Sequence, residues 1–193
     1  MSTVYSIGQM NQLADALEAA GYTPNDVTKL RSKPEALKEF KLVLGGMSKI
    51  VAVKHVIDLD ANPMVPDGWS VEEHQRGGSF KWNPAKVAPY LSKKQMGNKR
   101  IEGNKLRKEL EGKFVFNACL LDYLLAYPQL IPEEWKGKTF FFWGTIYRRN
   151  SDGNLCVRCL LWYDRSWDWG CYWIDDNFFD FDGDNPAAVL ASN

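Results

Sequence analysis

The segment from Trp135 to Asp176 constrains the fold more than any other part of the chain, because it contains six of the eight tryptophans. Aromatic and β-branched residues, which are frequent in β-strands, dominate three runs within it. The runs are Thr139–Arg148, Leu155–Tyr163 and Trp167–Ile174. Between the first two, Asp152-Gly153 supplies the positive φ of a tight hairpin turn. The segment therefore predicts an antiparallel meander of three strands.

The alternation of side chains assigns faces to these strands. Residues two apart in a strand share a face, so Trp167, Trp169, Cys171 and Trp173 point to one side of the third strand. The first two strands are apolar on both faces, which is typical of strands in the interior of a protein. We therefore expect helices to cover one side of the sheet and the third strand to be half-buried.

Two interpretations of the tryptophans stay open. Aromatic side chains bury a large area, and an indole N–H is tolerated inside when it has one partner, so the rings could form the core. A large exposed aromatic surface instead marks an interaction site, where the rings would contact a sugar, a base or a peptide. The candidate contact residues are Trp143, Trp162, Trp167, Trp169, Tyr172 and Trp173. We expect one or two of them to meet a protein, glycan or nucleic-acid ligand.

The first 46 residues predict a separate bundle of three short helices. Ser6 with Gln9 and Thr23 with Asp26 have the spacing of capping boxes, and a third helix begins at Pro34. Three such helices could form a helix-turn-helix DNA reader. This segment has five basic and five acidic residues, without the excess of positive charge that phosphate contacts require. We therefore expect a helical segment at 1–46 and an α+β domain at 47–193.

The middle of the chain predicts short strands and helices in alternation. We expect a strand over Ser48–Asp60, a hairpin of Trp69–Gln75 with Ser79–Trp82, a helix from Pro84, an apolar helix over Ala118–Tyr127 and a C-terminal tail NPAAVLASN. Within the apolar helix, Asp122 needs a hydrogen-bond partner such as an indole N–H or a backbone group. His74 next to Glu72 and Glu73 could be an acid/base site, but we interpret it as an exposed polar strand end. The fold class that follows is α+β.

Charge is balanced globally and segregated locally. Lysine plus arginine and aspartate plus glutamate number 24 each, so no overall field attracts nucleic acid or membranes. Lys86 to Lys113 nevertheless has a net charge of +6, and Asp164 to Asp184 has −6. The basic patch comprises Lys93, Lys94, Lys99, Arg100, Lys105, Arg107 and Lys108. The two segments could face each other or water, or the patch could bind phosphates in a nucleic-acid-associated or anti-defence protein.

Cysteines and aspartates offer the candidate metal sites. Cys156 and Cys159 form a C-x-x-C within a predicted strand, where they point to opposite faces and cannot both bind one zinc ion without a bend. We expect buried free thiols instead. Asp175, Asp176, Asp180 and Asp182 could serve a metal-dependent hydrolase, although the spacing does not match a calcium loop. The sequence has no phosphate-binding loop and no G-x-S-x-G motif, so we expect no cofactor, no metal and a non-enzymatic binding protein.

Location is predicted from two absences in the sequence. No run of 18 apolar residues occurs, and MSTVYSIGQMNQ lacks the basic start and apolar stretch of a signal peptide. The sequence therefore predicts a cytoplasmic protein with no membrane partner.

Several runs carry a resemblance. The segments are EEWKGKTFFFWGTIYR, NPAAVLAS, MNQLADALEAAGYTPNDVTKLRS and PDGWSVEEH. Together they resemble a family of small bacterial proteins with a Trp-rich C-terminal region, found mainly in candidate-phylum genomes and without an established activity. The similarity extends over nearly the whole chain. It implies a bacterial origin and one conjoined architecture, and it assigns no catalytic residue.

Overall fold

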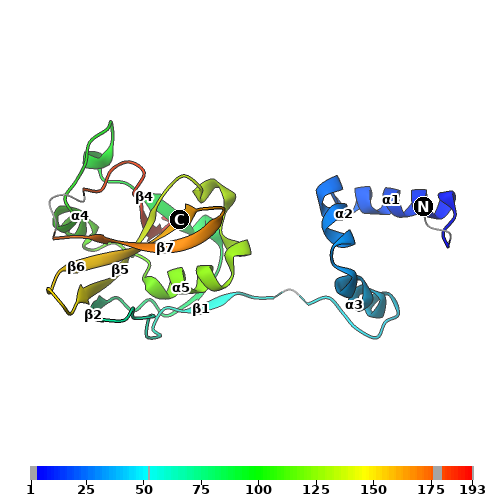
Figure 1. Cartoon of the computed structure of the whole chain (residues 1–193), viewed down its shortest axis with the longest axis horizontal. Helices are drawn as coiled ribbons and strands as arrows, with labels where there is room; N and C mark the ends of the chain where they lie inside the picture. Colours follow the sequence, from blue (N-terminus) through cyan, green and yellow to red (C-terminus); the bar gives the residue numbers. More distant parts are fainter. Residues whose placement is uncertain (1–3, 52, 176–179, 193) are drawn as a thin grey trace. The chain divides into compact units, whose positions relative to one another are not determined.

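The chain forms two compact units, Met1–Val53 and Lys54–Asn193 (Figure 1). The structure is a computed structural model that describes residues 4–51, 53–175 and 180–192. Helices and mixed sheets both occur, so the fold class is α+β as the sequence predicts.

The N-terminal unit consists of three helices whose starts are encoded locally. They are α1 (Ile7–Ala19), α2 (Pro24–Arg31) and α3 (Pro34–Leu44). The Ser6–Gln9 and Thr23–Asp26 capping boxes are both present, whereas α3 begins without a side-chain cap. No residue within these three helices is buried. Their apolar stripes thus remain largely accessible within the described residues of this unit.

A six-stranded sheet organises the C-terminal unit. Its order is β4-β8-β5-β6-β7, and β2 pairs with β5 beside this path. The strands are β2 (Trp69–His74), β4 (Val87–Tyr90), β5 (Phe140–Arg149), β6 (Leu155–Tyr163), β7 (Ser166–Trp173) and β8 (Ala187–Leu190). All pairs are antiparallel except β5 with β8. A separate two-stranded sheet joins β1 (Val56–Asp58) to β3 (Ser79–Lys81).

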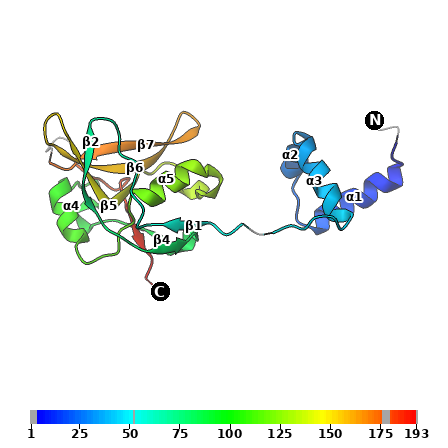
Figure 2. The same cartoon turned by 90° about the horizontal axis from the view of Figure 1, so that it is seen from below.

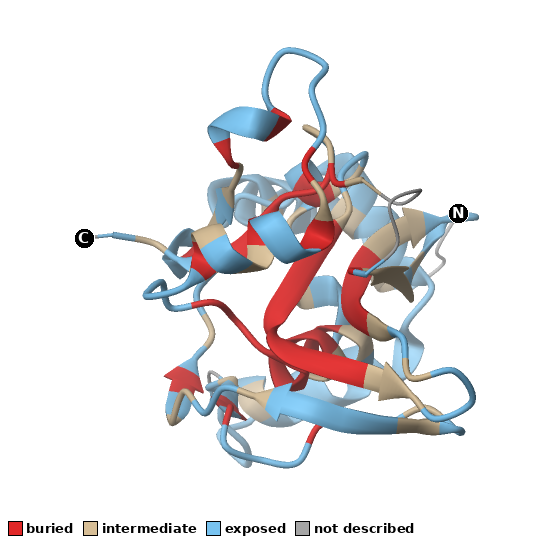
Figure 3. Cartoon of the chain, turned by 90° about the vertical axis from the view of Figure 1, so that its left-hand side faces the viewer, coloured by how far each residue is buried: buried red, intermediate tan, exposed pale blue. Residues whose placement is uncertain are grey.

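The predicted meander of β5, β6 and β7 is confirmed. The second turn contains Asp164 and Arg165, both with positive φ, which joins β6 directly to β7. Most of β5 is buried (Figure 3). Its register with β6 shifts between Phe141 and Ile146, and within this stretch an added Cβ at Gly144 would lie 2.8 Å from the Val115 carbonyl oxygen. Glycine is therefore required for the close approach of these two chain segments.

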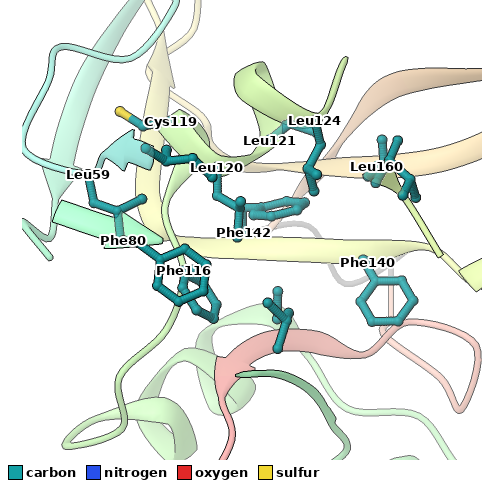
Figure 4. Packing of buried hydrophobic residues seen from close by; sticks show 14 of the residues in the cluster. Leu59, Phe80, Phe116, Cys119, Leu120, Leu121, Leu124, Phe140, Phe142 and Leu160 are labelled. Carbon is teal, nitrogen blue, oxygen red and sulfur yellow. The ribbon is translucent and has the colours of Figure 1, made fainter. Parts of the chain in front are cut away.

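Helices lie on both faces of the sheet, whereas the sequence predicted them on one side only. On one face lies α5 (Ala118–Ala126) (Figure 2), and its leucines pack against Phe142 of β5 (Figure 4). Asn117 caps this helix by accepting a hydrogen bond from the Cys119 N–H at 3.1 Å. On the other face, α4 (Gly103–Leu110) packs with Phe141, Phe181 and Ile174 in a second core. Short 3-10 turns complete the unit: η1 (Pro84–Lys86), η2 (Lys93–Gln95), η3 (Pro128–Leu130) and η4 (Glu133–Trp135).

Three local predictions for the middle of the chain are wrong. The strand expected over Ser48–Asp60 is reduced to β1, because pairing with β3 extends only over Val56–Asp58. β2 and β3 do not form a hairpin, since β2 pairs with β5 and β3 pairs with β1. The helix expected from Pro84 lasts one turn, and the residues after it form β4 because they pair with β8. In the last two cases, distant partners override the local signal.

The predicted C-terminal tail is a strand inside the sheet. Residues Ala187–Leu190 form β8, which lies between β4 and β5. Ala187 and Ala188 are fully buried, and their side chains join the two cores on opposite faces of the sheet. A four-residue strand of small apolar residues resembles a tail in sequence, which explains the error.

Candidate functional site

The predicted alternation on β7 is confirmed by the partners of its side chains. Trp167 and Trp169 pack against the core that contains α5, whereas Trp173 packs with Ala118 and Tyr147. Trp162 of β6 lies directly opposite Trp167 and joins the same face. All four rings are half-exposed. We call Trp162, Trp167, Trp169 and Trp173 the tryptophan face.

The structure removes Trp143 from the predicted contact surface. Its side chain is only 4 % exposed and packs against Phe181, with 5.1 Å between ring centroids. The indole nitrogen has no hydrogen-bond partner among the described residues. The expectation that Trp143 meets a ligand on an open surface is therefore wrong, because α4 and the chain around Phe181 cover this face of β5.

Tyr172 lies on the opposite face from the tryptophan face. It is half-exposed and meets Phe141 edge to face, with 4.9 Å between centroids. Burial raises its pKa, and the neighbouring Cys159 and Asp182 raise it further. Tyr172 therefore belongs to the second core and does not extend the tryptophan face.

Cations lie over three of the four rings. The distances to the ring centroids are 3.9 Å from Lys136 Nζ to Trp162, 4.5 Å from Arg158 Cζ to Trp169 and 4.3 Å from Arg149 Cζ to Trp173. A cation over an indole ring contributes about 0.5–2 kcal/mol, depending on its desolvation. These contacts hold the rings in fixed orientations and place positive charge beside them.

At the turn end of the β6–β7 hairpin, two rings of the tryptophan face lie next to the strongly exposed Tyr163. Trp162 and Trp167 meet edge to face at 5.2 Å between centroids. Tyr163 follows at 69 % exposure, and the turn after it contains Asp164 and Arg165. At the other end of β7, Trp173 stacks on Trp69 of β2 at 5.4 Å. Because β5 and β6 lie between β2 and β7, this contact shows that the sheet is strongly curled.

Arg158 lies beneath the tryptophan face and was missed by the sequence prediction. Its side chain is completely buried in β6, and Nη1 lies 2.8 Å from Asp122 Oδ1 of α5. The same Asp122 accepts the Met64 N–H at 3.0 Å, which confirms the predicted bond to a backbone group. Tyr147 donates its hydroxyl to the Met64 carbonyl at 3.0 Å. An arginine within the apolar run LCVRCLLWY was the sequence signal for this network.

The free edge of Arg158 is unusual within this protein. Nε and Nη2 form one edge of the planar guanidinium group, and neither atom has a hydrogen-bond partner in the described part of the chain. Arg148 uses the same pair of atoms for both oxygens of Glu72, at 2.8 and 2.7 Å. Arg149 likewise engages Asp152. The site therefore holds a buried donor pair, which costs free energy while it stays unsatisfied.

The predicted basic patch is spread around η2 and α4 and is partly neutralised. Lys94 pairs with Glu109 at 2.8 Å and Lys105 pairs with Glu102 at 2.7 Å, while Arg107 pairs with Glu73. The exposed members without an ion pair in the described residues are Lys93, Lys99, Arg100 and Lys108. The acidic segment meets this region through Phe181, which bridges to Ile101, and through Asp175, which accepts from Asn104.

A pocket of about 510 Å³ beside α4 brings residues of the basic patch next to Trp143, one of the predicted contact tryptophans. Arg107 and Lys108 of the basic patch line it with Glu73, Glu111 and Trp143. The charges of the two cations are matched by the two carboxylates, so the pocket has no strong preference for anions.

Two of the candidate hydrolase aspartates and the histidine have structural partners. Asp175 accepts the Leu155 N–H and Asp182 accepts the Asp184 N–H, both at 3.0 Å, while Asp176 lies outside the described residues. Among the residues that the structure describes, no group of three acidic, histidine or cysteine side chains could hold a metal ion. His74 Nδ1 lies 2.8 Å from the Thr145 hydroxyl, while Glu72 pairs with Arg148 and Glu73 pairs with Arg107.

Comparison with known proteins assigns no function to this chain. No family model, no curated protein and no solved structure matches this chain. None of the helices in the described residues is long and apolar enough to cross a membrane.

Proposed function

We propose that the C-terminal unit is a non-enzymatic binding module whose ligand or partner contacts the tryptophan face. The observation that carries this proposal is the partial exposure of Trp162, Trp167, Trp169 and Trp173 in one row of the β6–β7 hairpin. Exposed aromatic residues gathered on one surface are typical of interaction sites, because each ring offers a large flat area that gains free energy when covered.

The buried tryptophans support this assignment by contrast. Trp135 and Trp143 are 5 % and 4 % exposed, so the same fold encloses indole rings where the core requires them. The four rings of the tryptophan face are instead left partly open although they lie on strands next to that core. The cations over Trp162, Trp169 and Trp173 fix these rings before any ligand arrives, which lowers the entropy cost of binding.

Tryptophan fluorescence of the whole protein tests the proposal. We expect acrylamide to quench a fraction of the emission, and one member of a panel of glycans, oligonucleotides and extended peptides to protect that fraction. The variants Trp162→Phe and Trp167→Phe keep an aromatic ring, and Trp162→Ala and Trp167→Ala remove it. Each alanine variant should weaken binding about tenfold or more, because stacking on one ring contributes about 1–3 kcal/mol.

The matched control is Trp82→Ala, since Trp82 is also half-exposed but its ring contacts Phe80 and Trp135 and it is not one of the four tryptophans of the face. This control should leave affinity unchanged. Protection of all tryptophan emission from acrylamide without ligand would contradict the proposal.

The exposed unpaired cations favour a second candidate, a nucleic-acid-associated function of the basic patch. Binding to an oligonucleotide would then weaken steeply with rising salt, and Lys99→Glu with Arg100→Glu would abolish it. Lys105→Glu is the control, because Lys105 is already paired with Glu102 and should contribute less. Binding that is insensitive to the double reversal would exclude this candidate.

A further inference from the structure

Two cysteines lie together on the tryptophan face. Cys156 of β6 is directly opposite Trp173, and Cys171 of β7 is directly opposite Arg158, so the cysteines are diagonal neighbours across one strand pair. Both belong to the cluster that contains Ala118 and Tyr147. Both are free thiols, with Cys156 completely buried and Cys171 half-exposed. Only one member of the pair is therefore open to a reagent in solution.

The two thiols differ in their affinity for a proton. The Cys156 thiol hydrogen-bonds to the Cys171 sulfur, which raises the pKa of Cys156 and lowers that of Cys171 to about 7. Burial opposes the second effect, while Arg149 and Arg158 reinforce it. The lowered pKa favours the thiolate of Cys171, which is the nucleophilic form of cysteine.

The surroundings of Cys171 are positively charged on two sides. Arg158 faces it from β6, and Arg149 approaches from β5, where its guanidinium lies over Trp173. Asp122 and Asp152 each hold one of these arginines and temper the field. A half-exposed thiol beside two cations and a second thiol has the environment of a redox-sensitive cysteine.

The other two cysteines provide internal comparisons. Cys159 lies on the opposite face of β6 and is buried, which raises its pKa to about 12. Cys119 at the start of α5 has a pKa of about 11, raised by burial and by Asp122, Asp58 and Asp60. Neither should form a thiolate at neutral pH. Any reactivity is thus expected at one of four cysteines.

We propose that Cys171 is an oxidation site for hydroperoxides and that Cys156 resolves the product into a Cys156–Cys171 disulfide. In the first step, the Cys171 thiolate attacks one peroxide oxygen, so an S–O bond forms, the O–O bond breaks, and the departing alkoxide or hydroxide takes up a proton. In the second step, the Cys156 sulfur attacks the Cys171 sulfur of the sulfenic acid. The S–O bond breaks, and the hydroxide leaves as water with the Cys156 proton. The peroxide is reduced by the two electrons that the thiols lose.

A disulfide between Cys156 and Cys171 would link β6 and β7 directly beneath the tryptophan face. Cys171 lies between Trp169 and Trp173 along β7, so a covalent link to β6 fixes the two strands beneath the rings. This inference is independent of the ligand of the tryptophan face, because it concerns only the reactivity of the chain itself.

Alkylation of the whole wild-type protein tests the reactive thiol. Iodoacetamide would be added at a series of pH values, and peptide mass spectrometry would follow each cysteine separately. Cys171 should react first, with a rate that rises through a midpoint near pH 7. Cys119 and Cys159 should stay unmodified until the protein is unfolded. Alkylation of Cys171 no faster than that of Cys159 would overturn the proposal.

Oxidation by one equivalent of hydrogen peroxide tests the second step. We expect a loss of two hydrogens in mass and a linked pair of peptides that contain Cys156 and Cys171. In Cys156→Ser the reaction should stop at a sulfenic acid that dimedone traps on Cys171, whereas Cys159→Ser should behave like the wild type. Formation of no linked pair in the wild-type protein, or a pair that includes Cys159, would overturn the assignment of Cys156 as the resolving cysteine.

Discussion

Arg158 of β6 and Asp122 of α5 form an ion pair between the centre of the sheet and the helix that covers it. Arg158 Nη1 lies 2.8 Å from Asp122 Oδ1, and the arginine side chain is completely buried while the aspartate side chain is 26 % exposed. Among the residues that the structure describes, Asp122 is the only carboxylate that forms an ion pair with this buried guanidinium. Removal of that counter-charge is costly, since the remaining ion cannot be hydrated.

The first prediction concerns this pair. Asp122→Ala should lower the free energy of unfolding by about 3–5 kcal/mol, because it leaves the buried guanidinium without a carboxylate. The double variant Arg158→Met with Asp122→Leu should regain most of the loss, since neither charge is then buried. Urea unfolding curves measure both. Equal losses in the single and double variants would contradict the prediction that the unpaired buried charge causes the loss.

The second prediction concerns alkaline stability. Burial raises the pKa of Tyr147 to about 12, while an unfolded tyrosine ionises near 10. The folded state thus keeps a proton that the unfolded state loses, so this stabilisation is complete below about pH 10 and is lost as pH rises through about 12. In Tyr147→Phe the decline between these pH values should be shallower. Denaturant unfolding at several alkaline pH values would reveal an unchanged slope if the inference is wrong.

The third prediction compares two glycines in the first turns of helices. An added Cβ at Gly103 of α4 would lie 2.6 Å from Ile174 Cα, a backbone atom that cannot move aside easily. Gly103→Ala should therefore destabilise the C-terminal unit by about 1–3 kcal/mol. Gly8→Ala in α1 is the control, because the nearest atom is 3.9 Å away, and it should be neutral or slightly stabilising. Circular dichroism during thermal unfolding distinguishes the two.

The fourth prediction concerns acid. Arg149 holds the pKa of Asp152 at about 2, below its usual 3.8, and the Asn154 backbone N–H contributes to the shift. Because the folded pKa is depressed, the contribution to stability is present above about pH 3.8 and is lost as pH falls through about 2. A carbon-13 titration of the aspartate carboxyls should show one midpoint near 2 that disappears in Asp152→Asn. A set of midpoints that all lie near 4 would contradict the ion pair.

Local signals predicted the parts of the fold that depend on neighbours in sequence. The capping residues Ser6 and Thr23 determine where α1 and α2 begin, and Asn117 does so for α5. Asp152-Gly153 determines the first turn of the meander. Each of these signals acts within a few residues, so the rest of the chain cannot override it easily.

The predictions for β2 and β4 were wrong because these strands pair with distant segments of the chain. Val87–Tyr90 follows a proline and an N-cap residue, which favour a helix, yet it becomes β4 because β8 offers it backbone partners. β2 likewise pairs with β5, more than 60 residues later, rather than with the run that follows it. Hydrogen bonds between remote segments depend on the assembled core and leave little trace in a short window of sequence.

In the candidate site, too, the features set by local sequence were predicted and those set by distant contacts were not. Alternation placed Trp167, Trp169 and Trp173 on one face correctly, because the period of a strand is fixed. It could not reveal that Trp143 would be covered by α4, or that Arg158 would find Asp122 from another element. Such encounters depend on which helix lies on which face, and the sequence does not state that arrangement.

The location of β8 has a consequence for how the protein is made. A ribosome releases β4 first and β5 some fifty residues later, but the strand that lies between them is the last of the described strands to be synthesised. Until Ala187–Leu190 has left the ribosome, β4 has no backbone partner and one edge of β5 is open. During synthesis the nascent chain therefore exposes apolar strands with unpaired edges. Such a state is prone to aggregation and is one that chaperones protect. A truncation before Ala187 would make this state permanent.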